Sequence, residues 1–286
     1  MKRLIILAVA LCCVFHAAKA FTPAGAPTAE IAVPLRVIER NNMMIVSAKV
    51  DGAPCALLFD TGATHTSLDA SFASKVLTNS TPVEVAIAGD TNVKSRPVAL
   101  KVAELEIGEA KFTDFSVMSV DLGHLPKSVG EPVVGVLGMN VISRVPTLLS
   151  AGSGRVVFNP GVNERNGFAR PVRSASPDPL EIVFGIRKGG KPFPVLVDSG
   201  ASMTFMNAAH WPRGTNNVAI AASDVNGSSG LNAAPGEKAS LPLGIPVEIF
   251  PMVGDSVPDC IGADTLKRYD MLIESPFVSF RASQRP

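Results

Sequence analysis

The sequence predicts an all-β protein made of two similar lobes, and three observations support this prediction. Turn-forming residues are frequent, with 24 glycines and 23 prolines in 286 residues, whereas charged residues make up 18% and aromatic residues 6%. Apolar runs are short and end at these turn residues, which is typical of strands rather than of long helices. A pattern of residues also recurs at an offset of 138 positions. The length allows a sizeable core and favours two domains.

The first 20 residues are predicted to be a secretory signal peptide. A basic pair, Lys2-Arg3, precedes an apolar run from Leu4 to Phe15, and Ala18-Lys19-Ala20 offers a cleavage site. The run is shorter than the ~20 residues that a membrane span needs. We therefore expect an exported protein, periplasmic or secreted, without stable membrane insertion after signal removal. Residues 21–34 are expected to be a flexible N-terminal segment.

Charge and cysteine content exclude several classes of partner. Removing the signal lowers the formal charge from +1 to −2, because the segment carries three cations and no acids. No basic patch for nucleic acid remains. Cys55 and Cys260 lie outside the signal. A disulfide is possible in an exported protein, but we favour free thiols because the two residues fall in different lobes. The histidines lack metal-ligand spacing, so we expect neither a metal nor a cofactor.

The repeat is clearest around two acidic residues, Asp60 and Asp198. Each follows a four-residue apolar run and precedes a small hydroxyl residue, Thr61 or Ser199, and then a glycine. Upstream of each acid, a β-rich run and a tight turn lead into the strand that ends at the acid, which predicts a hairpin. The aligned pairs include Gly52 and Gly190, Pro54 and Pro192, Leu58 and Leu196, Gly62 and Gly200, and Thr66 and Thr204.

Similar elements follow each acid in the same order. Turn-forming residues predict hairpin tips at Gly89–Asn92 and Asp224–Gly230. Two apolar residues and a glycine come next, and two short strands end each half. Helices are expected to be few and short, at Ala70–Val76 after an Asp69 cap and for about one turn after Gly138 and Gly262. The predicted lobes are 35–158 and 180–286, joined by a linker at 159–179 that lacks apolar periodicity.

One acid in an equivalent place in each half suggests that both carboxyl groups meet at the junction of the halves. Two carboxyl groups within hydrogen-bonding distance share one proton over a wide pH range. The ionised acid can then deprotonate a water molecule while the protonated acid donates to a substrate carbonyl. The alternative is a pair of structural turn aspartates. That alternative does not explain why an apolar-apolar-glycine element recurs after each acid.

Two pairs of motifs carry a resemblance to a known family: Asp60-Thr61-Gly62-Ala63 with Val136-Leu137-Gly138, and Asp198-Ser199-Gly200-Ala201 with Cys260-Ile261-Gly262. They resemble the two signatures of pepsin- and retropepsin-type aspartic proteases. The resemblance implies two retropepsin-like acid-protease barrel lobes that form a pseudo-dimer within one chain. Such a protein would act as a monomer on a peptide or an unfolded protein, without a cofactor.

The resemblance also implies roles for particular residues. Asp60 and Asp198 would form the catalytic dyad. The supporting residues of the active-site loops would be Thr61, Gly62, Ser199, Gly200, Gly138 and Gly262. Substrate would contact flap and pocket residues at Ala88, Gly89, Asp90, Val136, Ser223, Asp224 and Cys260.

The sequence also departs from the family pattern. The single tyrosine, Tyr269, lies outside the first flap, where pepsins place one, and Met139 and Ala263 stand where retroviral enzymes have a bracing arginine. Ala63 and Ala201 replace the usual Ser or Thr of pepsins, so no hydroxyl lowers the pKa of either acid. We therefore expect a weakly acidic to neutral pH optimum. Two alternatives stay open, a catalytically inactive peptide-binding module and a protease active only as a homodimer.

Overall fold

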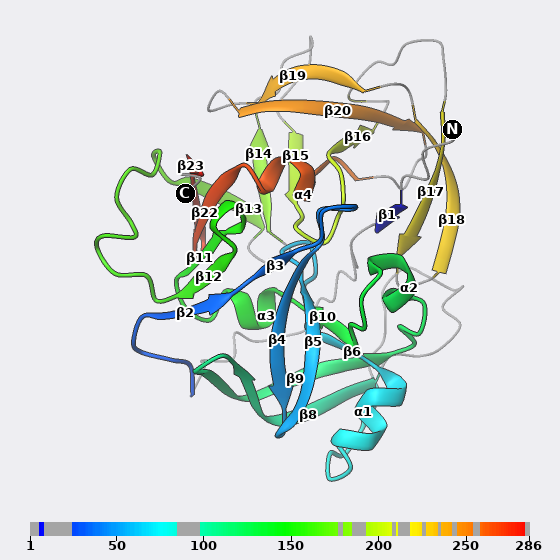
Figure 1. The fold of residues 1–286 in the computed structure, drawn as a ribbon, viewed down its shortest axis with the longest axis vertical. Coiled ribbons are helices and arrows are strands. Elements are labelled where there is room, and N and C mark those ends of the chain that lie inside the picture. The colour runs from blue at the N-terminus through cyan, green and yellow to red at the C-terminus, as the bar shows by residue number, and fades with distance from the viewer. Residues whose placement is uncertain are drawn as a thin grey trace.

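The computed structural model describes residues 6–8, 25–84, 98–176, 180–184, 193–207, 210, 218–224, 227–233, 236–241, 245–253 and 258–283. Strands dominate these residues, as the sequence predicts, and the α-helices among them are short. In Figure 1 the strands β3–β10 lie in the lower part of the molecule, and β14–β16 with β19 and β20 lie in the upper part.

The first half of the chain forms a closed barrel of six strands. The strands are β4 (Met44–Val50), β5 (Ala53–Phe59), β6 (Ser67–Asp69), β8 (Val98–Ile107), β9 (Ala110–Val120) and β10 (Gly135–Leu137). Their order is β4-β5-β10-β6-β9-β8, and pairing of β4 with β8 closes the ring. Two short strands, β3 (Arg36–Val37) and β7 (Val83–Glu84), extend it. The interior holds large side chains such as Phe59, Leu105 and Phe112.

The hairpin that carries the first acid forms where the sequence predicts it. Asp51 and Gly52 have φ values of 46° and 82°, and positive φ at both central positions is the backbone that a two-residue hairpin turn requires. The turn sets β4 against β5 in the register Val50↔Ala53 to Ile45↔Leu58.

The second half repeats the pairings of the first but is not closed. Its strands are β14 (Glu181–Phe184), β15 (Phe193–Val197), β16 (Phe205–Asn207), β17 (Val218–Asp224), β18 (Gly227–Ala233), β19 (Glu237–Leu241), β20 (Ile245–Val253) and β21 (Cys260–Ile261). β21 lies parallel to β15 and antiparallel to β16, as β10 does to β5 and β6. Within the described ranges, β14 pairs with neither β18 nor β19.

The prediction of two barrel lobes therefore holds for the first half only. Closure of the first barrel uses Lys49 and Val50, at the turn end of the first hairpin. The corresponding end of the second hairpin, 185–192, falls outside the described residues.

Six strands from both halves form a shared antiparallel arrangement. They are β2 (Ile31–Pro34), β11 (Thr147–Ser150), β12 (Arg155–Phe158), β13 (Val172–Ser176), β22 (Tyr269–Glu274) and β23 (Phe277–Ala282). Their order is β13-β23-β22-β11-β12-β2, and the β11–β22 pairing joins the two halves. Leu148, Val157 and Leu272 pack together on this sheet.

Two of these strands fall in segments that the sequence predicts to be irregular. β2 lies in the predicted flexible segment 21–34, and β13 lies in the predicted linker 159–179. Each is short. β2 lies at the end of the strand order beside β12, whereas β13 lies between β23 and β14. These neighbouring strands supply the hydrogen-bond partners that such short segments lack locally.

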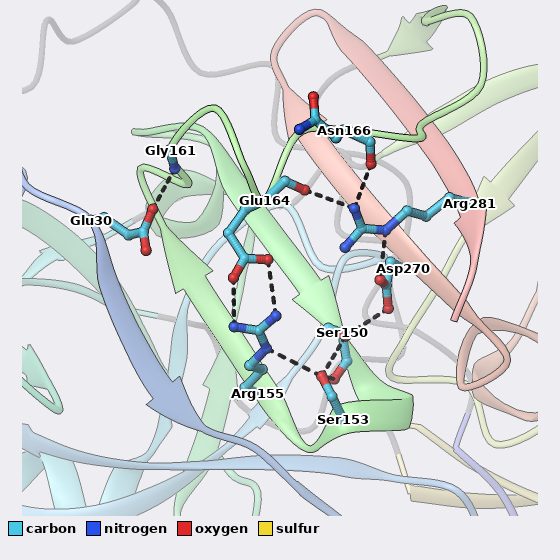
Figure 2. A network of polar contacts seen from close by, with 9 residues as sticks. All are labelled: Glu30, Ser150, Ser153, Arg155, Gly161, Glu164, Asn166, Asp270 and Arg281. Carbon is cyan, nitrogen blue, oxygen red and sulfur yellow. Dashed lines mark hydrogen bonds and ion pairs between the residues drawn. The ribbon is translucent and has the colours of Figure 1, made fainter. Parts of the chain in front are cut away.

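A network of polar contacts ties the end of the second half to the first half and to the connecting segment. Asp270, which is 3% exposed, accepts hydrogen bonds from Ser150 Oγ at 2.6 Å and Arg281 Nε at 2.8 Å. Arg281 also donates to the carbonyl oxygens of Glu164 and Asn166 at 2.9 and 2.7 Å. Figure 2 shows these side chains converging from separate strands and the loop.

Among the described residues, three of the four α-helices lie where the sequence predicts them. α1 (Ala70–Val76) begins after Asp69, whose Oδ1 accepts the Ser71 N–H at 3.0 Å. α3 (Met139–Ile142) and α4 (Ala263–Leu266) follow the two conspicuous glycines. α2 (Leu125–Val129) is not predicted; it has a proline in its first turn and ends at Gly130, with φ 82°.

The predicted hairpin tips are described in part. Gly89–Asn92 lies outside the described residues. β17 and β18 stay paired as far as Asp224↔Gly227, so the second hairpin extends into the predicted tip Asp224–Gly230.

The predicted signal peptide is described only at Ile6–Ala8, which forms β1 and pairs parallel with β17. In the part of the chain that the structure covers, no helix has the length and hydrophobicity to cross a membrane.

Candidate active site

Two strands, β5 and β15, each end in a buried acid. Asp60 is 3% exposed and Asp198 is 1% exposed. Behind each acid runs the short strand of the apolar-glycine element. The Asp60 N–H donates to Leu137 O and the Asp198 N–H donates to Ile261 O, both at 3.0 Å. Each acid is thus fixed at the end of its strand by a second strand from later in the same half.

The glycines that end these elements allow the backbone to pass close to the acid loops. A Cβ atom on Gly138 would lie 2.5 Å from the carbonyl carbon of His65, and one on Gly262 would lie 2.2 Å from Met203 O. Both distances are too short for any side chain. Gly138 and Gly262 therefore support the loops as the sequence predicts, by close packing of backbone.

Thr61 and Ser199 join the two acid loops by reciprocal hydrogen bonds. Thr61 Oγ1 donates to Val197 O at 2.5 Å, and Ser199 Oγ donates to Phe59 O at 2.7 Å. The Thr61 N–H donates to Ser199 Oγ, and the Ser199 N–H donates to Thr61 Oγ1, both at 3.1 Å. Both residues are fully buried. This grid holds the ends of β5 and β15 together across the junction of the two halves.

The acids face one another across this junction. Asp60 Oδ1 accepts the N–H groups of Gly62 and Ala63 at 2.8 and 3.0 Å, and Asp198 Oδ1 accepts those of Gly200 and Ala201 at 2.8 and 3.1 Å. A hydrogen bond joins the two carboxyl groups.

Gly62 and Gly200 leave the space that this approach requires. A Cβ atom on Gly62 would lie 2.5 Å from Asp198 Cγ, and one on Gly200 would lie 2.3 Å from Asp60 Oδ2. Each glycine therefore packs against the acid of the opposite loop.

Burial raises the pKa of both acids. For Asp60, desolvation is opposed by the hydrogen bonds from Asp198, Gly62 and Ala63. For Asp198, desolvation is reinforced by repulsion from Asp60, and its pKa lies well above the usual value. The pair is therefore expected to hold one proton between its two carboxyl groups over a wide pH range.

The strands behind the two acids differ in one side chain beside the carboxyl group. Cys260 Sγ lies 3.9 Å from Asp198 Oδ2, and its counterpart in β10 is Val136. Both side chains are buried, at 0% and 3% exposed. Neither Cys55 nor Cys260 forms a disulfide.

The predicted flap residues are not brought to the site by the described structure. Ala88, Gly89 and Asp90 lie outside the described residues. Ser223 and Asp224 belong to the end of β17, where the structure describes the backbone. Among the described residues, no group of three or more His, Cys, Asp or Glu side chains is arranged to hold a metal ion.

One residue that contacts the loop after Asp198, Asn42, is not indicated by the sequence analysis. Asn42 bonds to the loop that follows Asp198 and to Lys267. The available signal is the Asn41-Asn42 pair directly before an apolar strand. Asparagine is a common turn residue, but its partners lie more than 150 residues away and no local pattern identifies them.

The first barrel matches a known family. Residues 46–141, about a third of the chain, match the family model described as "Aspartyl protease". The match begins in β4, contains Asp60 and Gly138, and ends in α3. A search of curated proteins gave no match. Over these residues the first half of the chain is thus similar to an aspartyl protease domain.

Proposed function

We propose that this chain is an exported aspartic endopeptidase, in which Asp60 and Asp198 activate a water molecule to hydrolyse peptide bonds. The observation that carries the proposal is the hydrogen-bonded pair of buried acids at the ends of β5 and β15. The family match over residues 46–141 supports the reaction class. The basic and apolar start of the sequence supports export.

One proton shared by the pair suits the two halves of the reaction, and the proposed mechanism places it on Asp198 at the start. Ionised Asp60 takes a proton from water as the water oxygen attacks the peptide carbonyl carbon. Protonated Asp198 donates its proton to the carbonyl oxygen, which gives a neutral tetrahedral diol. Collapse of the diol breaks the C–N bond. The proton on Asp60 then passes to the leaving amine, and a diol hydroxyl returns its proton to Asp198, which restores the starting state.

We further propose that one chain supplies the whole site as two fused lobes. The matching bonds around Asp60 and Asp198, and the strands β11 and β22 that pair across the halves, support this arrangement. An extended peptide or unfolded protein is the proposed substrate, because an extended chain can pair with the backbone of hairpins such as β17–β18.

Cleavage of an unfolded protein tests the proposal. We expect the purified mature chain to digest a reduced, unfolded protein at weakly acidic pH, and a statine-type transition-state mimic to block the digestion. The active species should have the mass of one chain in solution. Binding of the mimic without cleavage would instead favour a peptide-binding module, and activity confined to a double-mass species would favour a homodimer.

The pH dependence of cleavage follows from the buried pair. Because burial raises the pKa of both acids, we expect activity at weakly acidic to neutral pH. The variant Ala63→Ser places a hydroxyl donor beside Asp60 and stabilises its ionised form. The bell-shaped profile of kcat/KM should then move toward acid by about one pH unit. An optimum of the unmodified chain only in strong acid, or no shift in Ala63→Ser, would contradict this account.

A further inference from the structure

The turn between β3 and β4 carries a side chain that reaches the second half of the chain. Asn42 Nδ2 donates to Ser202 O at 3.1 Å, and Asn42 Oδ1 accepts from Lys267 Nζ at 2.6 Å. Ser202 lies four residues after Asp198, and Lys267 directly follows α4, which packs behind the same loop. The side-chain amide of Asn42, from the first half, therefore contacts both the loop that follows Asp198 and the end of α4 behind that loop.

The chemistry of the partners fixes the orientation of this amide. The ammonium group of Lys267 can only donate, and the carbonyl oxygen of Ser202 can only accept. The Asn42 oxygen must face Lys267, and its NH₂ group must face Ser202. A side chain with both an acceptor and a donor is therefore required.

The turn that carries Asn42 is held in the first half by hydrogen bonds of its neighbours. The turn is closed by the bond from Ile38 N to Met43 O at 2.8 Å. The neighbouring Asn41, which is 7% exposed, donates to Val129 O at 2.9 Å and thereby ties the turn to α2. Asn42 itself has φ 62°, a left-handed backbone that asparagine tolerates.

The first half contacts the opposite acid loop through a side chain, whereas the second half does so through a backbone N–H group. The position equivalent to Asn42 in the second half is Leu180, at the same offset of 138. Its backbone N–H donates to Thr61 O at 3.1 Å. Each half thus reaches the acid loop of the other from the same place, but only the first half uses a side chain, which a substitution can remove.

We propose that Asn42 is a positioning residue for the acid pair, and that it holds the Asp198 loop at a fixed distance from Asp60 through the Ser202 carbonyl. The expected effect of Asn42 on kcat rests on the proposed function. Its expected effect on the apparent pKa values of the acid pair does not. Without this bond the mean separation of the two carboxyl groups increases. Wider separation weakens the sharing of one proton and brings the two apparent pKa values of the pair closer together.

Two substitutions separate positioning from general stabilisation. Asn42→Gly keeps the left-handed backbone and removes both side-chain bonds. Asn42→Asp keeps the acceptor for Lys267 and adds an ion pair, but it cannot donate to Ser202. We expect kcat to fall about 10- to 100-fold in both variants, with KM within about twofold of the unmodified value. A purely structural role predicts that Asn42→Asp retains full kcat, and that result would overturn the proposal.

A titration that does not depend on cleavage completes the test. In protein with ¹³C-labelled aspartate carboxyl groups, the spacing between the two apparent pKa values of the pair should narrow in Asn42→Gly and in Asn42→Asp. Asn159→Gly is the matched control, because Asn159 also has positive φ and donates its amide to a carbonyl, far from the acids. It should leave the spacing unchanged.

The two proposals fail in different ways. Unchanged spacing in both Asn42 variants overturns the inference whether or not the protein cleaves peptides. Narrowed spacing in a protein that cleaves nothing leaves the positioning role intact and overturns the proposed function alone.

Discussion

Asp60→Asn and Asp198→Asn are each expected to lower peptide hydrolysis by about 10²- to 10⁴-fold, the range that general acid–base catalysis contributes. Asparagine matches aspartate in shape, so the hydrogen bonds that Gly62 and Gly200 make with the acids can be largely kept. It can neither take a proton from water, the role proposed for Asp60, nor donate an acidic proton, the role proposed for Asp198. Initial rates of peptide cleavage at the optimum pH measure the loss. Near-normal turnover in either variant would contradict a mechanism that needs both acids.

The stability of Asp198→Asn provides a control for folding. The folded pKa of Asp198 lies well above the usual value, mainly because of desolvation and then because of repulsion from Asp60. A raised folded pKa means that stability is lost as pH rises from the usual Asp range, near pH ~4, through the folded pKa. Asparagine does not ionise, so Asp198→Asn should match the unmodified chain in acid and exceed its stability at neutral pH. Urea unfolding at both pH values measures the difference.

Asp69→Asn should change the stability at neutral pH in the opposite direction to Asp198→Asn. Desolvation of Asp69 is outweighed by hydrogen bonds from Ser71, Leu122 and Phe72, so its folded pKa lies below the usual value. Its contribution to stability is present at neutral pH and is lost as pH falls through the folded pKa. The asparagine variant should therefore be less stable than the unmodified chain at neutral pH, with the gap closing in acid.

Features set by neighbouring residues could be predicted from the sequence. The Asp51-Gly52 turn, the Asp69 cap of α1 and the acid loops each depend on residues within a few positions. The pairing of the two acids could be proposed because the halves repeat. The grid of Thr61 and Ser199 then follows from the same symmetry.

Features set by distant partners could not be predicted in this way. β2 and β13 have weak local patterns, and their conformation is decided by pairing with β12 for β2 and with β23 and β14 for β13. The contact of Asn42 with Ser202 spans 160 residues, so no local pattern reports it. The expected second barrel depends on closure at a hairpin end that the structure does not describe.

The buried carboxylate of Asp270 illustrates how such distant contacts stabilise the fold. Asp270 in β22 lies opposite Ser150 in β11, so its contacts join the ends of the two halves (Figure 2). The Asp270 carboxylate also accepts hydrogen bonds from Arg281 Nε in β23 at 2.8 Å and from Ser283 Oγ, just after β23, at 3.1 Å. The guanidinium of Arg281 is itself held over the Phe168 ring at 4.4 Å. The carboxylate is therefore both paired and hydrogen-bonded, which is the condition for burying a charge.

Asp270→Ala is expected to lower the free energy of unfolding by about 3–5 kcal/mol, because it leaves a largely buried guanidinium without its counter-ion. The side chain of Arg281 is 16% exposed and that of Asp270 is 4% exposed, so water cannot fully replace the lost bonds. Urea unfolding at neutral pH measures the change. Glu274→Ala in the same strand removes a more exposed partner of Arg165 and should shift the midpoint little, since surface ion pairs contribute little to stability. If the two variants lose the same small amount, the network around Asp270 does not stabilise the junction, and the apolar contacts of β11 with β22 must hold the halves together.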